Sequence, residues 1–312
     1  MLTKPTKTAT LKTILAAATC VALALATSLM LTACASGGKG AGGKVAAKAG
    51  QWTYTDFPVP RIIHSGGWML GVTVDPRMNL TVTCVIRRPS APSALPLDAP
   101  VSDDLRITCI GLGVFRGCTS LTGVTIPLGV TSIGAEAFTG CTGLTHVDIP
   151  SSVTSIGDEA FDGCTGLTRV DIPSRVTSIG RSAFSGCTGL TSVTIPPRVT
   201  RINRSAFYRC TGLTSVTIPT GVTSIENTAF VGCTGLTRVD IPSGVTRIGN
   251  SAFRECIGLI SVTIPSSVTH IENAAFDGCT GLTSVTIPAG TEISNGTFPA
   301  STRIIRPEAK AD

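Results

Sequence analysis

The chain has 312 residues, of which 42% are hydrophobic and only 14% are charged. Its formal net charge is +6, but basic and acidic residues are equal in number from Leu112 to the C-terminus. A neutral body exerts no general attraction on nucleic acid, so we expect no nucleic-acid partner. The three histidines are His64, His146 and His270, and none belongs to a nucleophile, phosphate-loop or metal-ligand motif. These observations argue against an enzyme.

Residues 1–33 have the order of a secretory signal peptide: lysines, then an apolar stretch from Ile14 to Leu31, then small residues. The stretch ends in Leu31-Thr32-Ala33-Cys34, which resembles a bacterial lipobox. This resemblance implies that Cys34 is acylated and becomes the new N-terminus. The alternative is a transmembrane anchor with an incidental cysteine, because the apolar stretch is near the minimum length of a span.

Residues 34–50 are rich in Gly, Ala and Lys and predict a flexible tether. Acyl chains on Cys34 would anchor such a chain through the burial of many methylene groups. The residue after the cysteine is Ala35 rather than Asp, which favours export to the outer membrane in a cell with two membranes. We therefore expect an exported lipoprotein that is anchored at the outer membrane or cell surface.

The body of the chain repeats with a period of 23 residues. Phenylalanine recurs at this step in eight copies from Phe115 to Phe276, and cysteine does so from Cys118 to Cys279. One unit reads LTSVTIPSGVTSIxxxAFxGCTG. The Val and Ile of LxxVxI alternate and so point to one side of a strand, which Pro ends because it lacks an N–H. A single unit cannot bury its apolar residues, but stacked units can.

The repeat therefore predicts a solenoid of the α/β type that is mostly β. Val-Thr-Ser-Ile is a second extended run, and a short 3₁₀ or helical turn is expected at Ala-Phe. The pattern resembles the BspA-like class of bacterial leucine-rich repeats, which have units of the form LxxLxLPxxLxxIxxxAFxxCxx. The resemblance covers Ile107 to about Ile293. It implies a curved coil with a parallel sheet, export, and in several members binding to host matrix proteins or other cells. It supplies no catalytic residues.

The repeat and its flanks define the expected domains. The solenoid is expected at 105–293, with Leu105 to Cys118 as a degenerate first coil. Residues 294–312 are expected to form a C-terminal cap, because Phe298 breaks the phase of the repeat and polar Arg303 and Arg306 accompany a closing strand. Residues 51–104 predict a small β N-cap followed by a Pro-rich linker from Arg88 to Asp104.

The eight repeated cysteines allow a metal site, disulfides or buried thiols. Parallel side chains on separate coils converge poorly on a tetrahedral metal, and no His or carboxylate shares their column. We therefore expect a ladder of buried thiols, with no metal and no cofactor. Cys109 falls at the exposed position held by Ser132 in the next unit, and Cys84 lies in the N-cap. Outside the cytoplasm such thiols tend to be oxidised, which predicts a Cys84–Cys109 disulfide.

Two surfaces could bind a ligand. The first consists of the residues that flank the repeated Val, which are mostly Ser and Thr with charged pairs in three units. It is either a solvated face with weak ion pairs or a shallow polar groove for a protein or glycan. In the second case the charged focus would be His146, Asp148, Arg169 and Asp171.

The second surface is a basic strip. Between Arg169 and Arg209 there are seven arginines and one acid, Asp171. The stacked arginines repel each other, so an anionic partner would relieve them; the alternative is drift at surface positions of duplicated units. The expected strip comprises Arg175, Arg181, Arg198, Arg201, Arg204 and Arg209.

These features favour an anchored surface protein that binds an extracellular matrix protein or an acidic glycan, in adhesion or host interaction. We expect it to be monomeric. The alternative is a structural envelope protein that self-associates without an external ligand. An ice-binding surface is disfavoured, because His, Arg and Asp interrupt the threonine face.

Overall fold

The computed structural model describes residues 53–55, 61–65, 68–74, 79–87, 93–96 and 106–307. The predicted signal peptide, Cys34 and the tether lie outside the described residues. Within the described part, the chain consists of strands joined by turns and bends. No helix among these residues has the length and apolar character needed to cross a membrane.

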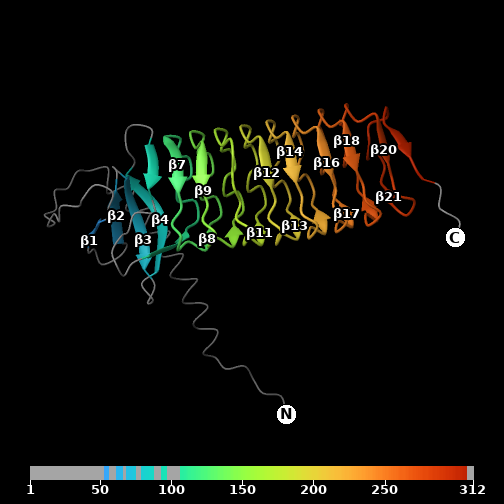
Figure 1. Ribbon diagram of the computed structural model, residues 1–312. Coiled ribbons are helices and arrows are strands. Elements are labelled where there is room, and N and C mark those ends of the chain that lie inside the picture. Colours follow the sequence, from blue (N-terminus) through green and yellow to red (C-terminus); the bar gives the residue numbers. More distant parts are fainter. Residues whose placement is uncertain are drawn as a thin grey trace, which may run out of the picture. The chain divides into compact units, whose positions relative to one another are not determined.

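From Arg106 onward the chain winds into coils that stack side by side, each about one repeat long (Figure 1). This confirms the predicted parallel repeat solenoid. The coils contribute strands to a first row, seen along the upper edge of Figure 1, except the coil of Arg169, which contributes an isolated bridge to Ser192. Most coils also contribute a two-residue strand to a second row below it. The first row contains β7 (Leu121–Thr125), β9 (His146–Asp148), β12 (Ser192–Thr194), β14 (Ser215–Thr217), β16 (Arg238–Asp240), β18 (Ser261–Thr263), β20 (Ser284–Thr286) and β22 (Arg303–Ile305). The second row contains β6 (Arg106–Ile110), β8 (Ser132–Ile133), β10 (Ser155–Ile156), β11 (Ser178–Ile179), β13 (Arg201–Ile202), β15 (Ser224–Ile225), β17 (Arg247–Ile248), β19 (His270–Ile271) and β21 (Glu292–Ile293).

Paired strands in both rows are parallel, and between the regular coils they are in phase with the repeat; the last pair in each row, β19–β21 and β20–β22, departs from that phase. Val193 pairs with Val216 in the first row, and Ile202 pairs with Ile225 in the second. The in-phase register places the repeated apolar residues of all coils in one continuous core between the rows. Because side chains alternate along a strand, the residues beside the buried Val and Ile face outward.

The repeated phenylalanines form a continuous stack through this core. Nine rings, from Phe115 to Phe298, lie 5.1–5.6 Å apart between centroids, with interplanar angles of 3–12°. Phe298 stacks on Phe276 although the intervening coil is one residue shorter than the others. The widest separation, 5.6 Å, lies between Phe184 and Phe207.

The repeated cysteines are buried thiols, as predicted. From Cys141 to Cys279, each Sγ donates a hydrogen bond of 3.0–3.2 Å to the phenylalanine carbonyl of the preceding coil. Burial raises the pKa of Cys164 and Cys210 to about 12. The ladder therefore combines an apolar side chain with a weak donor that satisfies a buried carbonyl.

The Ala-Phe segments form hydrogen-bonded turns and no helix, in contrast to the expected 3₁₀ or helical turn. Left-handed residues interrupt them at two positions in each coil. In the coil of Phe138 these are Glu136 (φ 57°) and Gly140 (φ 70°). The second position is glycine in every coil from Gly117 to Gly278 except two, where Arg209 (φ 53°) and Glu255 (φ 60°) replace it. An L-residue in this conformation is strained.

The N-terminal end of the stack is covered by further strands. The strands β1 (Thr53–Thr55), β2 (Arg61–Ser65), β3 (Trp68–Val74) and β4 (Asn79–Arg87) pair as an antiparallel meander, and β4 then pairs in parallel with β6. A further strand, β5 (Ser93–Pro96), lies within the predicted linker and pairs with β7. Both rows are thus extended beyond the first coil, which protects their edges from pairing with another chain.

The C-terminal coil is closed by polar side chains that satisfy backbone carbonyls. Thr291 and Thr302 are buried, and their hydroxyls each donate a 2.7 Å hydrogen bond, to Val268 O and Leu282 O respectively. The guanidinium of Arg306 donates to three carbonyl oxygens of the last turn, at 3.1–3.4 Å. These contacts replace the ladder that a further coil would provide.

Candidate binding surfaces

The outer face of the first row carries same-strand ion pairs. Arg169 lies 3.0 Å from Asp171, and Arg238 lies 3.0 Å from Asp240. The hydrogen bonds from Arg238 lower the pKa of Asp240, with Thr263 donating a further bond of 3.1 Å. All four charged side chains are more than 60% exposed, so each pair contributes little to stability.

His146 and Asp148 are positioned by the preceding coil. A Cβ atom at Gly123 would lie 2.2 Å from His146 Cε1, so the imidazole covers the backbone of a coil that has no side chain there. Asp148 accepts a 3.3 Å hydrogen bond from Thr125. Arg169 and Asp171 instead bind each other, and no strand pairing joins β9 to their coil. The four residues of the predicted charged focus thus lie on neighbouring coils, and the one ion pair among them joins Arg169 to Asp171.

Five of the six predicted basic-strip residues lie on the path of the second row, and all five are exposed. Arg201 is on β13 and has an acidic partner, Glu226, at 3.4 Å. The other four flank β11 and β13 in the turns before and after them: Arg175, Arg181, Arg198 and Arg204. These four form no ion pair within the described coils.

Arg209 is separated from the other five by the phenylalanine turn. It stands in the glycine column with a left-handed backbone, and its guanidinium lies 5.3 Å from the centroid of the Tyr208 ring. The basic strip predicted from the sequence is thus one group of five arginines, with Arg209 placed after the turn.

The predicted Cys84–Cys109 disulfide is wrong, because Cys109 is a half-buried thiol whose Sγ lies 3.3 Å from Ser132 Oγ. In the parallel pairing of β4 with β6, Cys109 is aligned with Thr81, three residues before Cys84. Three extended residues span about 10 Å, which exceeds the roughly 7 Å that a disulfide can bridge between Cα atoms.

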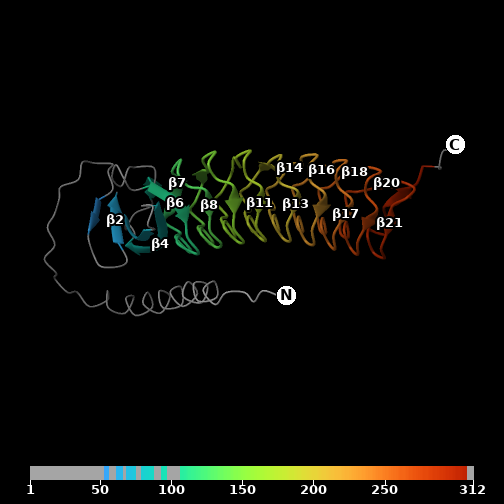
Figure 2. The same cartoon turned by 90° about the horizontal axis from the view of Figure 1, so that it is seen from below.

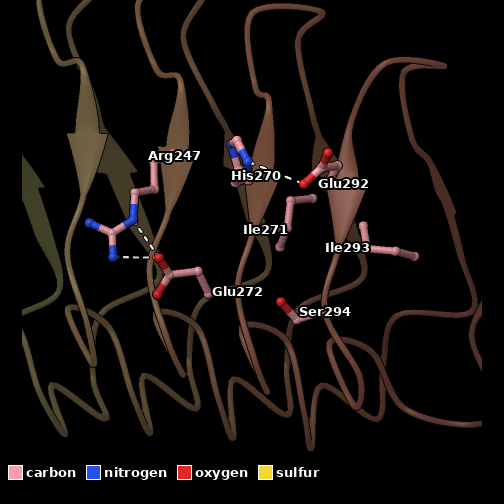
Figure 3. A pocket seen from close by; sticks show the side chains of 7 residues that line it. All are labelled: Arg247, His270, Ile271, Glu272, Glu292, Ile293 and Ser294. Atoms are coloured by element: carbon pink, nitrogen blue, oxygen red, sulfur yellow. Dashed lines mark hydrogen bonds and ion pairs between the residues drawn. The ribbon is translucent and has the colours of Figure 1, made fainter.

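A charged depression on the second row was not predicted from the sequence. It has a volume of about 380 Å³ and is lined by residues of β17, β19 and β21 and the turns after them (Figure 3). Arg247 pairs with Glu272 across one coil junction, and His270 Nε2 lies 3.2 Å from Glu292 Oε2 across the next. These residues replace the Ser and Gly of earlier coils, and that departure from the repeat was the available signal.

The hydroxyl that lines the depression does not contact its imidazole. Figure 3 places Ser294 apart from the His270 ring, whose Nδ1 instead lies 2.8 Å from Thr269 Oγ1. Across the described part of the chain, no cluster of three or more His, Cys, Asp or Glu side chains could hold a metal ion. The arrangement offers charged and polar contacts, as a binding surface does.

Comparison with known proteins shows which family has this architecture. The profile of the BspA type leucine-rich repeat region matches residues 108–236 and 200–307, with six copies. A leucine-rich repeat protein of Bacteroides ovatus is 29% identical with a TM-score of 0.67, and the match covers 75% of this chain and 66% of that protein. The chain thus spans slightly less than two thirds of that relative.

Two further solved structures are similar. A leucine-rich cell surface protein of Faecalibacterium prausnitzii is 32% identical with a TM-score of 0.62, covering 80% of this chain and 77% of that one. A leucine-rich repeat protein of T. pallidum is 27% identical with a TM-score of 0.50, covering 68% and 87%. No protein of curated function matches. With its profile match, its 23-residue unit and its parallel coils, the chain belongs to the BspA-type leucine-rich repeat family.

Proposed function

We propose that the protein is a surface-anchored, non-catalytic binding protein that engages a protein or an acidic glycan through the outer faces of its coils, in adhesion or host interaction. One observation carries this proposal: the repeated Phe, Leu, Cys and Ala are all buried in the coil stack. The residues left to vary between coils are on the outer faces, and these are polar and charged. Repeat solenoids use such extended faces for binding.

The location rests on two further observations. Residues 1–34 have the pattern of a lipoprotein signal, with Cys34 as the acylated residue. One structural relative is described as a cell surface protein. A tether at 34–50 would let the coil stack extend away from the membrane while the acyl chains remain inserted.

The first test is a binding screen with the full-length protein in detergent against immobilised matrix proteins and sulfated and neutral glycans. The proposal expects salt-sensitive retention of at least one class, because the variable outer positions are largely charged or hydroxylated. Absence of retention across the screen would contradict it. Radiolabelled fatty acid incorporation, lost in Cys34→Ala, tests the anchor separately.

A second candidate, self-association in the envelope, is favoured by the C-terminal edge of the first row. Ile304 and Ile305 of β22 are 42% and 40% exposed, and among the described strands β22 pairs only with β20. A strand with one unpaired edge can template a second copy. Size-exclusion chromatography with light scattering decides between the candidates. A monomer is expected for the binding protein, and a dimer abolished by Ile304→Lys for the structural one.

A further inference from the structure

Five arginines form a compact array on the second row. On the coil of β13, Arg198, Arg201 and Arg204 follow each other at three-residue steps. On the preceding coil, Arg175 and Arg181 occupy the columns of Arg198 and Arg204, with Ser178 between them. Extended residues advance about 3.3 Å each, so this arginine array, whose ends lie in turns, is at most about 20 Å long in the strand direction and two coils wide.

The array lies over an interruption in the second row. From β6 to β11 and again from β13 to β21, every neighbouring pair of strands is hydrogen-bonded, but no pairing joins β11 to β13. Thr177 N donates to Thr154 O at 2.9 Å and Thr223 N donates to Thr200 O at 2.8 Å, whereas the described coils contain no equivalent bond from Thr200 to Thr177. Figure 2 views the stack from below, the side of the second row, with β11 and β13 on neighbouring coils. We call this interruption the seam.

The separation of the stacked phenylalanine rings is also largest at the seam. The rings of Phe184 and Phe207, which belong to the two coils at the seam, are 5.6 Å apart, the widest separation in the stack. The turns on the far side of the same junction remain bonded, since Phe184 N donates to Ala206 O at 2.9 Å. The loss of backbone contact is therefore local to residues 177–179 and 200–203, because Ser182 N donates to Arg204 O at 3.0 Å just beyond them.

Two groups at the seam can account for it. Arg175 stacks in column with Arg198, and Arg181 with Arg204, and none of the four guanidinium groups forms an ion pair in the described coils. Asp158 Oδ1 accepts a 2.7 Å hydrogen bond from the backbone N–H of Arg181. Like charges at coil spacing repel each other. In addition, the Asn203 side chain donates a 2.6 Å hydrogen bond to Ile179 O, the acceptor that a backbone N–H uses in other coils.

We propose that the arginine array binds an anionic polysaccharide, sulfated or carboxylated, which lies along the strand direction across β11 and β13 and closes the seam. This inference rests on the proposed binding function and names its ligand class and site. A guanidinium can donate two parallel hydrogen bonds to a sulfate or carboxylate group. Neutralising both stacked pairs removes the repulsion that separates the coils.

The array favours a polysaccharide over a peptide. Protein partners are usually anchored by buried aromatic or aliphatic contacts. The exposed large apolar residues of the described coils all lie outside the array: Leu112, Leu128, Ile257, Ile260, Ile304 and Ile305. Around the arginines the exposed side chains are Ser, Thr and Pro, with the acidic residues Asp158 and Glu159 on the coil before Arg181. Such a surface offers charge and hydrogen bonds without a pocket for an apolar anchor.

The test uses full-length protein in detergent and heparin-derived oligosaccharides as probes. Affinity is measured by fluorescence polarisation, and hydrogen exchange is followed in the segment 200–204. The double variant Arg198→Gly, Arg204→Asn introduces the residues that the next coil has at these positions, Gly221 and Asn227. The control Arg254→Ser, Arg303→Ser removes the same charge from two exposed arginines outside the array and outside the charged depression.

In the unchanged protein, an octasaccharide is expected to bind more tightly than a disaccharide and to slow exchange in 200–204 about tenfold. The double variant should lose at least about tenfold in affinity, since each removed guanidinium is a charge-assisted donor. It should also exchange more slowly than the unchanged protein without any ligand. The control should keep its affinity within about twofold.

Five results would overturn the inference. An equal loss in the control would show that only net charge matters. Tight binding without protection of 200–204 would separate the ligand from the seam, and equal binding of polyglutamate would remove the preference for a polysaccharide. Slower exchange in Asn203→Gly but not in the arginine variant would assign the seam to Asn203 alone. If a matrix protein is retained while no oligosaccharide binds, the proposed function stands and this inference fails.

Discussion

The buried thiol ladder predicts that the protein loses stability steeply at alkaline pH. Burial raises the pKa of Cys164, Cys187, Cys210 and Cys233 in the folded state. Hydrogen bonding to a neighbouring thiol, together with burial, raises the pKa of Cys141 and Cys256. In the unfolded chain a thiol has a pKa of about 8.5. Because the folded pKa is the higher one, stability is fully present below pH 8.5 and is lost as the pH rises above it, where only the unfolded chain gives up its protons.

The size of this loss follows from the number of thiols. Between pH 7.5 and 9.5, one thiol that ionises only on unfolding lowers the free energy of unfolding by about 1.4 kcal/mol, and six lower it by about 8 kcal/mol. Few other groups interfere, because from Leu112 onward the chain contains one lysine, Lys310, and one tyrosine, Tyr208. Arginine stays charged throughout this range.

The assay is equilibrium urea unfolding of the full-length protein, followed by circular dichroism at half-unit steps from pH 7.5 to 9.5 with a phosphine reductant. Replacing Cys164, Cys187 and Cys210 by Ala should lower stability at every pH but halve the slope against pH. If the triple variant does not fold, the single variant Cys187→Ala replaces it and should reduce the slope of the unfolding free energy against pH by about a sixth. A free energy of unfolding that stays within about 1 kcal/mol over this range, or an equal slope in the triple variant, would refute the reasoning.

Three further changes test other parts of the fold. Glu255→Gly should stabilise the protein by about 0.5–1 kcal/mol in thermal unfolding, because Glu255 has a left-handed φ of 60°. Gly232→Ala, at the equivalent position of the preceding coil, should destabilise the protein by at least as much. Phe207→Ala should cost about 3–5 kcal/mol, and Phe298→Ala clearly less, since the last ring is stacked on one side only; equal losses would contradict the stack. Arg306→Ala should cost about 1–2 kcal/mol and speed hydrogen exchange in the last coil alone, because its guanidinium binds three carbonyls there; uniform acceleration would argue against a local cap.

Several features of the binding surfaces could be read from the repeat, and others could not. A fixed period of 23 residues determines which residues occupy equivalent positions on successive coils, so the stacking of Arg175 with Arg198 was predictable. The pairing of His270 with Glu292 was not, because a one-residue deletion before Glu292 changes the spacing from 23 to 22. The disulfide prediction failed for a related reason: the alignment of β4 with β6 lies outside the repeat, and no period specifies its register.

By itself, the sequence determined that the chain is a parallel solenoid with a buried phenylalanine and cysteine ladder. Apolar residues that recur once per coil can be buried only by the neighbouring coils, and this condition admits a single register. Only the tertiary structure decided where the strand ladder stays closed and where it opens, as between β11 and β13. That outcome depends on the balance between side chains on adjacent coils, such as Asn203 against a backbone N–H, which the period does not encode.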